Sequence, residues 1–96
     1  MNGPTLKDWC IGWPPLAINY KMPIGLSNIC IRGVLYNSTR DKKGEIVLLT
    51  GITFLDTERG FLKTEKRGYL LGDPEAAFLD WLRMLKIKLS EYNIDA

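Results

Sequence analysis

The strongest constraint on the fold is one clear helix pattern at the end of a chain whose other apolar segments resemble strands. Asp73 is a favourable N-cap residue, and Pro74 suits the first helical position. The apolar residues that follow recur at intervals of three and four, which places them on one helical face: Phe78, Trp81, Leu82, Leu85 and Leu89. The sequence therefore predicts one amphipathic helix over residues 74–90, with a frayed end from Tyr92 to Ala96.

Three strand-like segments precede this helix. Residues 29–37 alternate between two sets of side chains, and residues 45–56 are almost continuously apolar, which is typical of a strand buried on both faces. The third segment spans residues 61–71, and residues 65–68 within it form either a second turn or a bulge. We favour a long bulged strand over a tight hairpin.

The first 23 residues hold four of the five prolines, yet they are rich in large apolar side chains. We expect an ordered, irregular Trp/Pro-rich arm across the domain, with a short strand around Trp9–Trp13 as an option. Residues 1–96 then form a single α+β domain. Its sheet, over residues 29–71, is an antiparallel meander of three to four strands, and the C-terminal helix packs on the sheet.

Composition excludes several classes of function. The chain has 96 residues, no histidine and a net charge of +2, so imidazole catalysis is excluded and nucleic-acid binding is not favoured. No apolar run reaches the length of a membrane span, and no signal peptide is expected. The two cysteines, Cys10 and Cys30, are typical of buried free thiols in a cytoplasmic protein. A disulfide between them is the alternative, which the sequence does not decide. Neither a metal nor a cofactor is expected.

The third strand segment contains the candidate binding residues. On an unbroken strand, alternate side chains share one face, which would gather Phe61, Lys63, Arg67 and Tyr69. Two cations between two aromatic rings suit an anionic, nucleotide-like ligand or a protein partner. The simpler interpretation is a solvated strand whose lysines and arginines discourage edge pairing.

These patterns favour a non-enzymatic binding protein. The apolar surface exceeds what one helix and a small sheet require, so we expect a homodimer, and an assembly protein that acts through the dimer interface is the first alternative. A small hydrolase that uses Asp56 or Glu58 as a general base is the weaker alternative, because both residues suit a turn.

One stretch of the sequence resembles a pattern in short uncharacterised bacterial and prophage proteins. The shared features are Thr64, the run Gly68-Tyr69-Leu70-Leu71-Gly72-Asp73-Pro74, and Trp81-Leu82 in the predicted helix. Glu65-Lys66-Arg67 departs from the pattern, in which a small Ser-Gly pair is more usual. The resemblance implies a mobile-element or accessory-gene setting and carries no activity to transfer.

Overall fold

A computed structural model of the chain describes residues 3–13, 19–37 and 43–95. These residues form one seven-stranded sheet, one α-helix and two short 3-10 helices. The strands are β1 (Thr5–Gly12), β2 (Cys30–Tyr36), β3 (Glu45–Leu49), β4 (Ile52–Asp56), β5 (Phe61–Thr64), β6 (Gly68–Leu71) and β7 (Ile94–Asp95). The helices are η1 (Leu26–Asn28), α1 (Ala76–Leu85) and η2 (Leu89–Tyr92).

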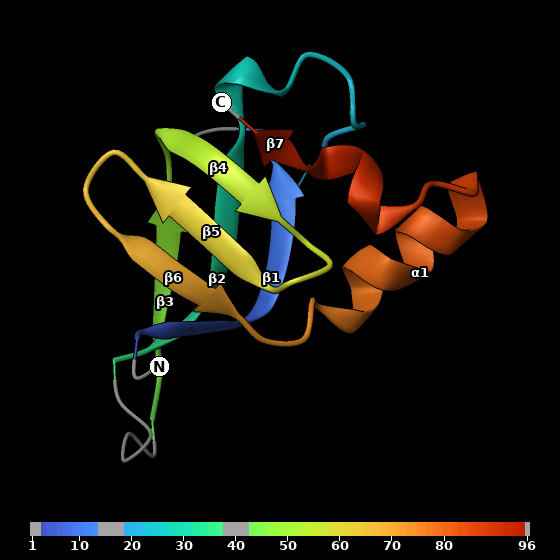
Figure 1. The fold of residues 1–96 in the computed structure, drawn as a ribbon. Helices are drawn as coiled ribbons and strands as arrows, with labels where there is room; N and C mark the ends of the chain where they lie inside the picture. Colours follow the sequence, from blue (N-terminus) through green and yellow to red (C-terminus); the bar gives the residue numbers. More distant parts are fainter. Residues whose placement is uncertain (1–2, 14–18, 38–42, 96) are drawn as a thin grey trace.

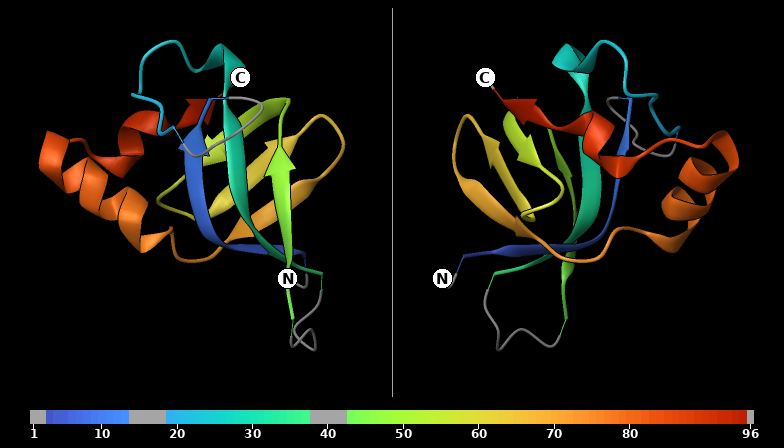
Figure 2. Two further views of the ribbon diagram at one scale, coloured as in Figure 1. Left: turned by 180° about the vertical axis from the view of Figure 1, so that it is seen from behind. Right: turned by 45° about the vertical axis from the view of Figure 1, so that its right-hand side comes forward.

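The strands lie in the order β3-β2-β1-β6-β5-β4-β7, and β1 and β6 run parallel while the other neighbours are antiparallel. The sheet bends so strongly that β4, β5 and β6 form a layer in front of β1, β2 and β3 (Figure 1). The helix α1 packs beside β1 at one side of the two layers (Figure 2). The α+β class and the packed C-terminal helix are confirmed, but the sheet is larger than predicted, and it is mixed.

The N-terminal segment is not an irregular arm, because its residues 5–12 form the central strand β1. A β-bulge shifts the register with β2 between Lys7 and Cys10, and Asp8 within it has a positive φ of 50°. The bulge interrupts the alternation of apolar and polar residues that reveals a strand. Sequence periodicity alone therefore misses most of β1, although the optional strand around Trp9–Trp13 overlaps its C-terminal part. The Pro14-Pro15 pair lies outside the described residues.

The predicted strand over residues 45–56 is two strands that occupy different positions in the sheet. Gly51, with a φ of 66°, turns the chain between β3 at one edge and β4 near the other. The expectation of burial on both faces is wrong for β3. Ile46 and Leu48 point outward and are 74% and 44% exposed.

The third predicted strand is a hairpin of β5 and β6, so the favoured bulged strand is wrong and the turn alternative is confirmed. The Thr64 hydroxyl explains the turn, because it accepts hydrogen bonds from the backbone N–H groups of Lys66 and Arg67. The Thr64 N–H in turn donates to the Arg67 carbonyl at 2.9 Å.

The helix is shorter than predicted at both ends. Its N-cap is Glu75 rather than Asp73, because the backbone of Pro74 bridges to Trp9 and prolongs the extended chain. It ends where Lys86 adopts a left-handed conformation, with a φ of 57°.

The predicted fraying is wrong for residues 92–95, and Ala96 lies outside the described residues. Tyr92 is fully buried in the core, and its hydroxyl donates to the Lys21 carbonyl. Residues Ile94 and Asp95 then pair with β4 as strand β7. The chain end therefore closes the edge of the sheet that β4 would otherwise leave open.

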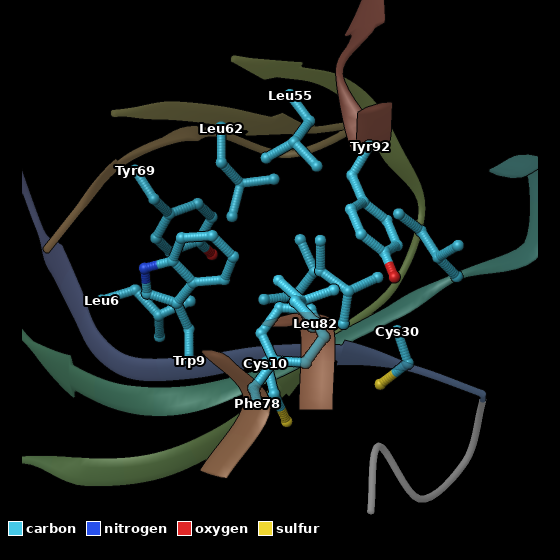
Figure 3. Close-up of a cluster of buried hydrophobic side chains, with 13 residues drawn as sticks. Leu6, Trp9, Cys10, Cys30, Leu55, Leu62, Tyr69, Phe78, Leu82 and Tyr92 are labelled. Carbon is cyan, nitrogen blue, oxygen red and sulfur yellow. The ribbon is translucent and has the colours of Figure 1, made fainter. Parts of the chain in front are cut away.

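The core lies between the two layers and against α1 (Figure 3). It joins apolar residues from both layers, from the helix and from the C-terminal segment: Leu6, Trp9, Cys10, Ile11, Ile29, Cys30, Ile31, Leu55, Leu62, Tyr69, Phe78, Leu82 and Tyr92. Within the described ranges, no helix combines the length and the apolar character that a membrane crossing requires.

Candidate functional site

The hairpin divides the four predicted binding residues into two pairs. Leu62 and its cross-strand partner Tyr69 point into the core, so Phe61 and Lys63 lie on the opposite, outer face of β5. There the Lys63 ammonium stands 5.9 Å from the centroid of the Phe61 ring. Arg67 is in the turn, with its guanidinium carbon 5.2 Å from the centroid of the Tyr69 ring. The predicted common face does not exist, but Arg67 and Tyr69 do lie together.

A hollow of about 280 Å³ lies next to Tyr69, at the C-terminal end of the edge strand β3. We call it the edge hollow. The hydrogen bond from the Glu65 N–H to the Gly51 carbonyl, at 3.1 Å, joins its two sides. Its lining comes from the end of β3, the corner before β4 and the β5–β6 turn: Leu48, Leu49, Thr50, Gly51, Thr64, Glu65, Lys66 and Tyr69.

Tyr69 contributes a free hydrogen-bonding group to this site. Its side chain projects from β6 into the space between the layers (Figure 3), and the residue is only 8% exposed. No hydrogen bond joins its hydroxyl to any residue that the structure describes, although Arg67 lies over the ring. In the same part of the chain, every fully buried side-chain N or O atom has a partner. Within the described residues the Tyr69 hydroxyl thus has no protein partner, and Tyr69 is one of the residues that line the edge hollow.

The turn beside the hollow holds positive charge in a fixed position. Lys66 and Arg67 follow one another in the turn that the Thr64 hydroxyl organises, and both side chains are exposed. Glu65 is the one acidic residue of the lining and lies on the same turn. A phenol donor with two adjacent cations is suited to an anionic group.

A second polar cluster, which sequence analysis did not identify, lies on the outer face of β1 and β2. Arg32 Nη2 is 2.6 Å from Glu75 Oε2, and the Tyr20 hydroxyl donates to Oε1 of the same carboxylate. Burial and the hydrogen bond to Glu75 hold the pKa of Tyr20 well above its ordinary value. Asp8 and Arg32 line a pocket of about 250 Å³ beside this cluster.

No short-range pattern could have revealed that cluster. Arg32 and Glu75 are 43 positions apart, and Asp8 owes its position to the bulge in β1. Each oxygen of the Glu75 carboxylate already has a partner within the protein. The cluster thus connects the start of α1 to the sheet. Because its carboxylate oxygens are already bonded, it has fewer groups available to bind a ligand than the edge hollow has.

Cys10 and Cys30 are both buried, and no disulfide joins them. Burial, followed by repulsion from the Glu75 carboxylate, raises the pKa of the Cys10 thiol to about 11. A thiol with a raised pKa is a poor nucleophile at neutral pH. This favours a structural role for Cys10.

The two carboxylates of the hydrolase alternative do not share a cleft. Asp56 Oδ1 accepts hydrogen bonds from the backbone N–H groups of Glu58 and Arg59, at 3.1 and 3.0 Å. Glu58 is exposed on the same turn, which ends at Gly60 with a φ of 72°. Asp56 therefore organises its own turn, while Glu58 lines a separate hollow of about 340 Å³ to which Asp73 also contributes.

Comparisons of the chain with protein-family models, curated proteins and solved structures found no match. The resemblance to bacterial and prophage proteins stays a prediction. Among the described residues, no three His, Cys, Asp or Glu side chains gather into a metal-binding group.

Proposed function

We propose that this protein is a small non-enzymatic binding module that takes an anionic small molecule into the edge hollow. The observation that carries the proposal is the Tyr69 hydroxyl, a donor without a partner among the described residues, on a side chain that is otherwise buried. A polar group in such a position costs free energy unless water or a ligand bonds to it. Tyr69 would donate this hydrogen bond, while Lys66 and Arg67 would supply the opposite charge.

The dimensions of the hollow limit the ligand. A volume of about 280 Å³ is at the lower end for small-molecule sites, which favours a phosphorylated or carboxylated metabolite no larger than a mononucleotide. Base stacking on Tyr69 is not part of the proposal, because the core and Arg67 already surround the ring. Phe61 and Lys63, on the outer face, lie outside this site and serve as controls.

A thermal-shift screen followed by calorimetry tests the proposal. The probes are inorganic phosphate, pyrophosphate, adenosine monophosphate, guanosine monophosphate and citrate. A probe at 100 times its dissociation constant should add about 2.7 kcal/mol of stability. If no probe at millimolar concentration raises the melting temperature, an anion site at the edge hollow is contradicted.

Two variants then locate the binding site. Arg67→Gln should weaken binding roughly 10- to 100-fold, because a charge-assisted hydrogen bond is lost. Tyr69→Phe should weaken it about 2- to 10-fold and leave the stability of the free protein within about 0.5 kcal/mol, because the hydroxyl has no partner to lose. Lys63→Gln is the matched control, since it removes a nearby cation from the other face of β5. An equal loss of anion affinity in Lys63→Gln and Arg67→Gln would show that binding depends only on general charge attraction, and it would refute the site.

A further inference from the structure

The edge strand β3 presents apolar side chains to solvent without any of the usual protection. Its outward residues Ile46 and Leu48 are among the most exposed large apolar residues that the structure describes, and Val34 of β2 lies directly beside Ile46. Natural edge strands are generally interrupted by charges, proline or bulges, which prevent pairing with other chains. Positions 46–49 of β3 contain none of these, and the pairing of β3 with β2 is regular over five residues. This edge is therefore ready to accept another strand.

We propose that β3 pairs with β3 of a second copy of the chain, antiparallel, about a two-fold axis at Val47. In this register Ile46 lies opposite Leu48 of the partner subunit, and the reverse pair follows by symmetry. Both exposed side chains then gain an apolar cross-strand neighbour on the same face of the sheet. A shift by one residue would pair outward side chains with inward ones, so the pleat of the sheet disfavours it.

The charges near β3 favour a second copy over an unrelated partner. Glu45 would lie opposite Leu49 of the partner subunit, so the two acidic side chains would not face one another. The strand carries no other charge, and the net charge of the chain is only +2, so repulsion between copies is small. Because Ile46 and Leu48 are symmetric about Val47, the apolar outer face of β3 is complementary to the same face of a second copy.

Sedimentation velocity over a dilution series tests the pairing without any ligand. The wild-type chain should sediment as a dimer at tens of micromolar and dissociate on dilution. Ile46→Lys should be a monomer at the same concentrations, because two ammonium groups would enter the seam. Met84→Lys, at a residue 71% exposed on α1, is the control and should remain dimeric. Circular dichroism confirms that both variants fold. A wild-type monomer at every concentration, or an Ile46→Lys dimer, would overturn the proposal.

Discussion

At the scale of single residues, the Glu75 carboxylate has the largest influence on its surroundings. It accepts hydrogen bonds from Arg32 of β2 and from Tyr20, and it belongs to the N-cap residue of α1, although it makes no capping hydrogen bond to the helix backbone. The side chains of Arg32 and Glu75 are 30% and 24% exposed, so solvent screens their attraction less than that of the exposed pair Asp80–Arg83. The same carboxylate lies close enough to Cys10 to disfavour a thiolate there.

The raised pKa of Cys10 predicts a loss of stability in mild alkali. Its pKa is about 11 in the folded chain, against 9.0 for an unperturbed thiol. Between these values the unfolded chain loses the proton and the folded chain keeps it, so the free energy of unfolding falls as pH rises. From pH 8 to pH 10 the loss from Cys10 alone should be about 1 kcal/mol, measured by urea unfolding.

The variant Cys10→Ala separates this effect from other titrations. It should lower stability at pH 8 through the small cavity that it leaves, yet its stability should fall less steeply toward pH 10. Cys30, Tyr20 and Tyr92, whose pKa values burial also raises, account for a remaining slope. An identical pH dependence in Cys10→Ala and in the wild type would show that this thiol titrates normally in the folded protein.

At the scale of elements, the C-terminal segment contributes more than its sequence indicates. Tyr92 contacts the ring of Phe78 at a centroid distance of 5.9 Å, and its hydroxyl satisfies the Lys21 carbonyl. We predict that Tyr92→Ala lowers the free energy of unfolding by about 3–5 kcal/mol, and that Tyr92→Phe lowers it by about 1 kcal/mol. Chemical denaturation measures both. The exposed control Asp95→Asn should stay within about 0.5 kcal/mol, and an equally small effect of Tyr92→Ala would mean that the segment is detached in solution.

Local patterns explain which elements could be predicted. The strand expected over residues 29–37 is β2, and the helix expected over residues 74–90 contains α1, because alternation and helical periodicity are properties of residues close in sequence. The bulge at Asp8 hides β1, and the pairing of Ile94 with Leu55 depends on a contact 39 positions away in sequence. The same limit applies to the binding residues. Arg67 and Tyr69 are neighbours in sequence, whereas the β3 side of the edge hollow exists only once the sheet has bent.

At the scale of the whole molecule, the two layers share one core and should unfold together. Leu62 comes from β5 in one layer, and Ile11 and Ile31 pair with each other in the opposite layer. The surplus of apolar residues in the sequence is used largely to join these layers, and the remainder is exposed on β3, on α1 and in the segment between β1 and β2. A chain of this size has too little apolar surface for two independent cores.

This shared core predicts that a cavity in one layer weakens the other by the same amount. Leu62→Ala should lower the free energy of unfolding by about 2–5 kcal/mol, because Leu62 is fully buried. Native-state hydrogen exchange should then show an equal loss of protection at the Ile11 and Ile31 amides, which open only when the whole chain unfolds. Lys63→Ala, the exposed neighbour on the same strand, is the control and should leave both amides unchanged. If Leu62→Ala accelerates exchange only within β4, β5 and β6, the layers are separate cooperative units and the single-core description is wrong.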